Sequence, residues 1–318
     1  MSLSNFISLI GNECRKMFVQ KSFIISLVII LIPIIVLGRW EFVGKELGAT
    51  KEANWKEEIR IDNENIEKEL KSADISEPAD QQLEKLAINN YRLQHNISHY
   101  EQHSVIDFMN KGASITNFIG ILLLYFASNM MSKEHQWKTI NFLLVKPSTR
   151  RMIYYAKFTS LSLLYFIFSL AILIYSFVIG CVINGFDFSA QPVLTYTNHQ
   201  VIEQSVLSSL VYNYLINLLP FLLFVSIAYF LSTILKSSSI SLLISIILFA
   251  TSDPIAALLS SKSWSKYLPF MHTDLTVYAQ GINIVNDMKI GFSIFMLILY
   301  TALFLISAGE VFKKRDVV

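Results

Sequence analysis

Residues 158–183 read FTSLSLLYFIFSLAILIYSFVIGCVI, a run of 26 residues without a single charged side chain. A helix needs about 20 apolar residues to cross the hydrocarbon core of a bilayer, because each residue adds about 1.5 Å of length. This stretch therefore predicts a membrane-spanning helix.

Five further apolar runs of similar length lie on either side of this stretch. They cover residues 22–38, 114–131, 210–235, 239–259 and 290–309. The composition agrees with a bilayer environment, since 53% of the residues are hydrophobic, 16% are charged and the mean hydropathy is +0.48. We expect an all-α, polytopic membrane protein with six transmembrane helices.

Basic residues are distributed unevenly among the connections. Lys and Arg outnumber the acids in residues 1–21, 132–157 and 310–318, whereas residues 39–113 carry more acids than bases and residues 184–209 contain neither Lys nor Arg. Because cationic segments are retained on the cytoplasmic side, the first three segments are expected inside and the other two outside. Six helices then leave both termini in the cytoplasm.

The outer segment 39–113 has a helical pattern. Residues 52–71 contain neither Gly nor Pro, and their apolar residues recur at helical spacing, as they do again in residues 81–98. This pattern predicts an extracellular helical hairpin between the first two spans. The alternative is a solvated, charged spacer.

Two shorter segments also carry helical signals. One face of residues 1–21 is apolar, which predicts an amphipathic helix lying flat in the interface; a cytosolic extension of the first span is the alternative. The pair Asp253 and Pro254 predicts a new short helix at the end of the fifth span, as an N-cap residue and a first-turn proline. We expect residues 254–289 to form re-entrant short helices, with a simple surface loop as the alternative.

Catalytic motifs are absent from the sequence. It contains no phosphate-binding G-x-x-x-x-G-K-[ST] or G-x-G-x-x-G and no H-E-x-x-H, so any nucleotide hydrolysis must come from another protein. His199 and His272 are expected to be ordinary solvated or capping residues. The chain is expected to be no enzyme, to bind no metal and no cofactor, and to make no disulfide between Cys14 and Cys181.

Neutral polar residues occur within the predicted spans. Asn129, Asn213 and Asn217 are best explained as interhelical hydrogen-bonding residues, with a translocation path as the alternative. Pro220 follows Asn217 closely and should kink the fourth span.

The connection between the second and third spans is unusually apolar for a basic inner loop. Trp137, Ile140, Phe142, Leu143 and Leu144 lie between Lys133 and Arg150. These side chains require a partner, which is either the membrane surface or a soluble protein that receives a short helix in a groove.

This loop resembles that of the permease subunits of ABC-2 type exporters (type V fold). That family has an acidic residue, Gly-Thr, Leu-Leu, a Pro-Ser-Arg-like turn and a Lys entering the third span. The matching residues here are Glu134, Thr139, Leu143, Leu144, Pro147, Ser148, Arg150 or Arg151, and Lys157. Lys138 stands where the family has glycine. The order of spans and the basic end, Phe312 to Asp316, extend the resemblance to nearly the whole chain except the outer hairpin.

The resemblance implies a coupling helix that docks in a separate ATP-binding subunit. The residues expected at that contact are Glu134, His135, Gln136, Trp137, Thr139, Ile140, Leu143, Leu144, Pro147, Arg150 and Arg151. It further implies two ATPase subunits that bind ATP and Mg²⁺, a second permease copy forming a homodimer or a heterodimer with a related chain, and a bacterial plasma membrane. The large outer insertion is similar to that of exporters of amphipathic peptides or toxins, including phenol-soluble modulins.

Two other classes stay open. A membrane sensor or partner-binding protein would use the extracellular hairpin, and an intramembrane enzyme would need catalytic residues that the sequence does not display. Nucleic acid is not an expected partner, because the net charge is only +2.

Overall fold

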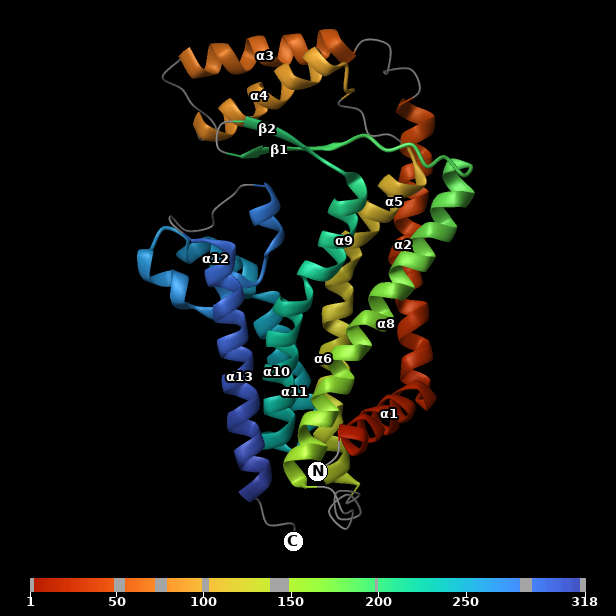
Figure 1. Cartoon of the computed structure of the whole chain (residues 1–318), viewed down its shortest axis with the longest axis vertical. Helices are drawn as coiled ribbons and strands as arrows, with labels where there is room; N and C mark the ends of the chain where they lie inside the picture. Colours follow the sequence, from red (N-terminus) through yellow and green to blue (C-terminus); the bar gives the residue numbers. More distant parts are fainter. Residues whose placement is uncertain are drawn as a thin grey trace.

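The computed structural model describes residues 3–48, 55–71, 79–98, 103–137, 149–197, 200–280 and 288–314. Long helices run side by side, and both ends of the chain lie at the same end of the bundle (Figure 1). Helices α3 (Trp55–Lys71) and α4 (Ala79–His95) lie at the opposite end. We call these two ends of the bundle the terminal end and the hairpin end.

Within these described ranges, six helical segments are long and apolar enough to cross a membrane. They are α2 (Lys21–Gly48); α5, η2 and α6 in a row (Val105–Gly112, Ala113–Ile115 and Thr116–Gln136); α8 (Arg150–Asn184); α9 and α10 (Val206–Ile216 and Leu218–Leu235); α11 and α12 (Ser238–Ala250 and Ser252–Leu259); and α13 (Ile290–Lys314). Each expected span lies inside one of these segments. The predicted helical fold with six candidate spans is confirmed.

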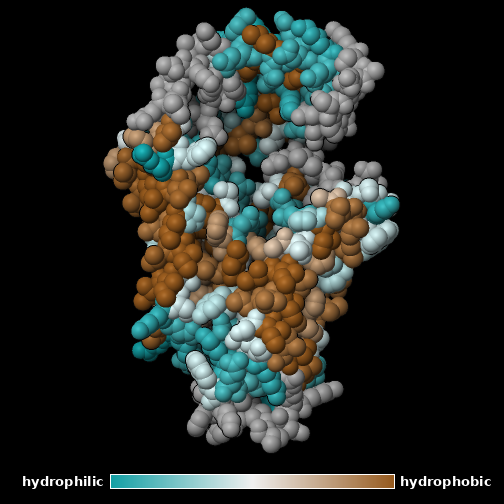
Figure 2. Space-filling model, turned by 180° about the vertical axis from the view of Figure 1, so that it is seen from behind, coloured by the Kyte–Doolittle hydropathy of each residue, from teal (hydrophilic) through white to brown (hydrophobic). Residues whose placement is uncertain are grey.

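Helix α10 lies at the centre of the bundle and packs against α6, α11 and α13. Serines allow α6 and α10 to approach closely: the backbone N–H of Ser132 donates to Ser232 Oγ at 3.0 Å, and Ser232 Oγ donates to the Ser128 carbonyl at 2.7 Å. The outer faces of the helices are apolar, and they form a hydrophobic belt between hydrophilic zones (Figure 2). Such a belt is the surface that a bilayer would cover.

The fourth span breaks where Pro220 predicts a kink. Helix α9 ends at Ile216 and α10 begins at Leu218, with Asn217 between them. Pro220 has no N–H to donate to the Ile216 carbonyl four residues earlier, which accounts for the break.

The first helix, α1 (Leu3–Val19), turns away from α2 at Gln20 and crosses the terminal end of the bundle (Figure 1). It packs against α8, and Met17 is buried there. Ile7 and Phe18 of the apolar face stay exposed. The helix is therefore not an extension of α2.

The hairpin end carries the expected helical hairpin. Helices α3 and α4 pack against each other through buried Ile59 and Ile66, and Asn63 Nδ2 donates to Asn90 Oδ1 at 3.0 Å. A two-stranded antiparallel ribbon was not expected. It consists of β1 (Val193–Thr197) and β2 (Gln200–Gln204), and it packs against α4.

Short helices follow α11, as predicted from Asp253 and Pro254, but Asp253 is not the N-cap. Thr251 occupies the N-cap position of α12, and Asp253 and Pro254 both lie in its first turn. Helix α12 starts at Ser252, and three 3-10 turns follow: η3 (Ser263–Tyr267), η4 (Pro269–His272) and η5 (Thr276–Gln280). The expectation of a solvated His272 is wrong, because its side chain is fully buried. His199 lies outside the described residues.

Candidate functional site

A buried ammonium group joins three helices at the terminal end. Lys157 of α8 is 1% exposed, and its Nζ donates to Glu13 Oε2 of α1 at 2.7 Å and to Glu134 Oε1 of α6 at 2.5 Å. Lys16 Nζ donates to the other oxygen of Glu13, Oε1, at 2.6 Å. We call these four residues the ion cluster.

The charges of the ion cluster compensate each other. An isolated ammonium would cost several kcal/mol to bury, whereas two carboxylates at hydrogen-bonding distance offset that cost. Burial by itself raises the pKa of the Glu13 carboxyl, but Lys157 and then Lys16 outweigh it and hold that pKa below its usual value. Removing the side-chain charge of Glu13, Glu134 or Lys157 leaves an uncompensated charge, so the cluster fixes the relative positions of α1, α6 and α8.

Glu134 and Lys157 were both expected at the loop between the second and third spans, and the structure brings them together. Glu13 was missed, because it belongs to a helix 121 residues away from Glu134 in sequence. The sequence does contain an indication of its role, because Glu13 is the one acidic residue in the otherwise basic segment 1–21. Sequence spacing could not show that this segment folds back onto α8.

The flanks of this loop are anchored to other helices. Gln136 Nε2 donates to the Lys236 carbonyl at 3.4 Å, in the turn between α10 and α11. Arg150 Nη1 donates to the Lys313 carbonyl at 3.3 Å, and Arg151 pairs with Glu310, both on α13. Both flanks of the loop are therefore tied to neighbouring helices.

Trp137 is the last described residue before the loop, and 68% of its surface is exposed. Lys133 Nζ lies 5.9 Å from its ring centroid. His135 lies in the last turn of α6. Five other expected contact residues lie outside the described residues: Thr139, Ile140, Leu143, Leu144 and Pro147.

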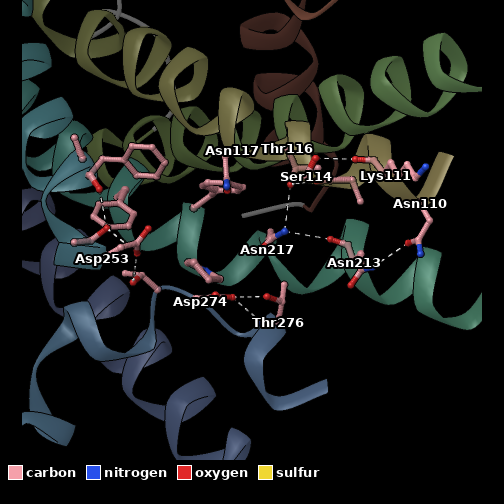
Figure 3. Close-up of a pocket in the computed structure, with 18 of the residues that line it drawn as sticks. Asn110, Lys111, Ser114, Thr116, Asn117, Asn213, Asn217, Asp253, Asp274 and Thr276 are labelled. Carbon is pink, nitrogen blue, oxygen red and sulfur yellow. Dashed lines mark hydrogen bonds between the residues drawn. The ribbon is translucent and has the colours of Figure 1, made fainter. Parts of the chain in front are cut away.

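Two of the three asparagines line a cavity of about 670 Å³ near the hairpin end (Figure 3). Asn213 Nδ2 donates to Asn110 Oδ1 of α5 at 3.0 Å, and Asn217 Nδ2 donates to Thr116 Oγ1 of α6 at 3.2 Å. Both residues thus make the interhelical hydrogen bonds expected of them. Asn129 makes no such bond in the described part of the chain, since its Nδ2 donates to the Tyr125 carbonyl of its own helix at 2.8 Å.

Six candidate spans, an apolar belt and polar groups gathered at both ends define a multi-pass membrane protein. Residues 84–318 match the family described as "Protein of unknown function (DUF2705)", and the chain belongs to this family.

Two proteins from Bacillus subtilis (strain 168) are similar to this chain, and one of them is described as a membrane protein. "Uncharacterized protein YhcI" is 28% identical over 317 residues, which cover 98% of this chain and 99% of the relative. "Uncharacterized membrane protein YdbK" is 24% identical over 224 residues, which cover 70% of this chain and 87% of the relative. The similarity to YhcI extends over α1 to α3, which precede the family match.

Proposed function

We propose that this chain is the permease subunit of an ATP-driven ABC exporter for a hydrophobic or amphipathic peptide. The observation that carries the proposal is the contact between Lys157 and Glu134, at the two ends of the loop that would dock the ATPase. The sequence holds no nucleotide-binding motif, so a partner subunit would bind and hydrolyse ATP with Mg²⁺.

The ion cluster suits the transmission of force. A push on the loop reaches Glu134 at the end of α6, and the short ionic contacts pass it through Lys157 to α8 and through Glu13 to α1. Because a buried ion pair resists separation, the three helices would move together. The terminal end would then face the cytoplasm.

Trp137 supports a docking surface at the same place. A tryptophan that is 68% exposed next to the apolar sequence of the loop offers an anchor for a groove on another protein. Two chains and two ATPases would make the working unit, as in the family that the sequence resembles.

The test is purification of the tagged chain from its own membranes, followed by an ATP-driven export assay of the complex. Trp137→Ala should reduce both ATPase co-purification and export. Trp264→Ala is the matched control, since this tryptophan is also exposed (57%) but lies on η3. Full co-purification and export with Trp137→Ala would contradict the docking assignment, and the absence of any co-purifying ATPase would contradict the proposal as a whole.

The hairpin favours a second candidate, a membrane sensor or partner-binding protein. Helix α4 packs on the ribbon, where Tyr91 Oη donates to Glu203 Oε1 at 3.2 Å, and this arrangement presents α3 as an outer surface. Under this hypothesis the full chain would bind a partner through α3, and no ATPase would co-purify with it.

A further inference from the structure

Among the described residues, five parts of the chain line the cavity near the hairpin end (Figure 3). Leu37 comes from α2; Asn110 to Asn117 come from α5, η2 and α6; Asn213 to Phe224 come from α9 and α10; Phe249 to Asp253 come from α11 and α12; and Thr273 to Thr276 run from the end of η4 to the first residue of η5. A volume of about 670 Å³ lies within the range of small-molecule sites, roughly 300–1,000 Å³. It would hold one or two side chains of a peptide but not a whole helix.

Three phenylalanines give the cavity an aromatic side. The ring centroid of Phe249 lies 6.1 Å from that of Phe221 and 5.1 Å from that of Phe224. Gly120 of α6 permits this packing, because a Cβ there would lie 2.7 Å from Phe221 Cε1. The cavity therefore offers apolar surface as well as polar groups.

Among the described lining residues three are charged, and the one cation of these three is already compensated. Lys111 Nζ donates to Glu41 Oε2 at 2.6 Å, and Glu41 Oε1 also lies 2.7 Å from His103 Nδ1. The remaining two charges are those of Asp253 and Asp274. Neither of them has a Lys, Arg or His nitrogen within 4.0 Å among the described residues.

In the part of the chain that the structure describes, neutral groups alone hydrogen-bond to these two carboxylates. Asp274 Oδ1 accepts from Thr276 Oγ1 at 2.6 Å and from the Thr276 backbone N–H at 2.9 Å, whereas the hydroxyls of Ser252 and Thr273 both lie 3.5 Å from Asp253 Oδ1. Both aspartates are exposed, so the described lining carries two solvent-accessible negative charges with no basic nitrogen within 4.0 Å of either. An ammonium group has three donors and one positive charge, which complements this lining.

The asparagines add acceptors. Asn213 and Asn217 use their Nδ2 groups as donors to neighbouring oxygens, so the oxygen of each amide is available to accept from a ligand. Acceptors on one wall, carboxylates on another and aromatic rings beside them suit a cation on an apolar stem.

We infer that this cavity binds the ammonium group of a cationic amphipathic peptide, from a lysine side chain or the amino terminus. Asp253 and Asp274 would accept from the ammonium, and the aliphatic stem would lie on Phe221, Phe224 and Phe249. The identity of the ligand as a peptide rests on the proposed export function. The charge preference rests on the cavity alone.

The test measures binding to the purified full chain in uncharged detergent, without an ATPase. The probe is a fluorescein-labelled amphipathic helix of Leu and Lys, compared by anisotropy with the same peptide carrying Gln at every Lys position. We expect the Lys peptide to bind more tightly, and Asp253→Asn with Asp274→Asn to weaken its binding about tenfold or more, the change that about 1.4 kcal/mol produces. Equal binding to both peptides, or no loss in the double variant, would overturn the inference.

Two further variants control for the loss of a carboxylate elsewhere on the surface and for misfolding of the double variant. Asp187→Asn removes an exposed carboxylate outside the cavity lining and should leave binding unchanged. Asn117→Asp adds a carboxylate at an exposed position in the lining and should strengthen binding of the Lys peptide. Weaker or unchanged binding with Asn117→Asp would contradict the charge preference even if the double variant failed to fold.

Failure of this inference differs from failure of the proposed function. Binding that depends on Asp253 and Asp274 with no co-purifying ATPase would uphold the cavity and reject the exporter. ATP-driven export with binding unaffected by these substitutions would uphold the exporter and reject the cavity as the ammonium site.

Discussion

Lys157 Nζ lies 2.5 Å from Glu134 Oε1, so a contact between α6 and α8 closes the base of the loop that separates them. The second carboxylate on the same ammonium belongs to Glu13 of the first helix. The first helix, which is distant in sequence, therefore meets α6 and α8 at one buried charge.

Replacing the central lysine should destabilise the protein more than replacing its exposed neighbour. Lys157→Met leaves the carboxylates of Glu13 and Glu134 close together without their ammonium, and the expected loss is about 3–5 kcal/mol in the free energy of unfolding. Lys16→Met removes a half-exposed partner and should cost less than about 1 kcal/mol. Unfolding of both variants in detergent, followed by circular dichroism, gives the comparison.

A rescue experiment separates charge from packing. Adding Glu13→Gln and Glu134→Gln to Lys157→Met removes the uncompensated carboxylates, so part of the lost stability should return. A triple variant less stable than Lys157→Met would show that the side-chain shapes, and not the buried charges, stabilise this junction.

Gly120 should tolerate no side chain where α6 meets the aromatic rings. A Cβ at this position would lie 2.7 Å from Phe221 Cε1 and 2.9 Å from Phe249 Cζ, so the rings must shift in Gly120→Ala. Overpacking of this kind costs about 1–3 kcal/mol. Gly44→Ala on α2 is the control, because no atom lies within 4 Å of its Cβ position. Equal thermal unfolding of both variants would contradict the close packing.

The segment η3–η5 should loosen in acid. Nε2 of His272 faces the Lys266 carbonyl at 2.9 Å and must carry the proton, so Nδ1 accepts from Ser293 Oγ, also at 2.9 Å, and Tyr278 Oη donates to Ser293 at 2.6 Å. Burial lowers the pKa of His272, with the Lys266 carbonyl acting in the opposite sense. The unfolded segment therefore takes up a proton more readily than the folded one.

The sign of the pH effect follows from this lowered pKa. The contribution of neutral His272 to the stability of this segment is fully present above the unfolded pKa of about 6.5. It falls as the pH drops below that value towards the lower pKa of the folded state. Hydrogen exchange of backbone amides in residues 263–278, corrected for intrinsic rates, should be faster at pH 5 than at pH 7.5, with little change in α10. His272→Asn should remove most of the difference, and an undiminished pH effect in that variant would assign it to another group.

Long apolar runs and helical periodicity predicted the spans, the hairpin and the short helix after α11, because these signals are local. The ribbon β1–β2 was missed, since its five-residue strands gain their packing from α4, far away in sequence. For the same reason Glu13 was missed and His272 was misjudged. From sequence alone, a single ionisable residue is expected to be solvated. The fold places Lys157 beside Glu13 and Ser293 beside His272, and sequence spacing does not show these neighbours.

The orientation of the bundle in the membrane decides whether the loop that follows Trp137 lies inside or outside the cell. The excess of Lys and Arg in residues 132–157 predicts that the terminal end faces the cytoplasm and the hairpin end faces outward. In a chain with Cys14 and Cys181 replaced by Ser, Glu57→Cys on exposed α3 should react with an impermeant maleimide in intact cells. Trp137→Cys should react only after the cells are opened, because its exposed position lies at the other end of the bundle. The reverse pattern would place the loop outside, where no ATP-hydrolysing subunit could reach it, and would remove the basis for an exporter.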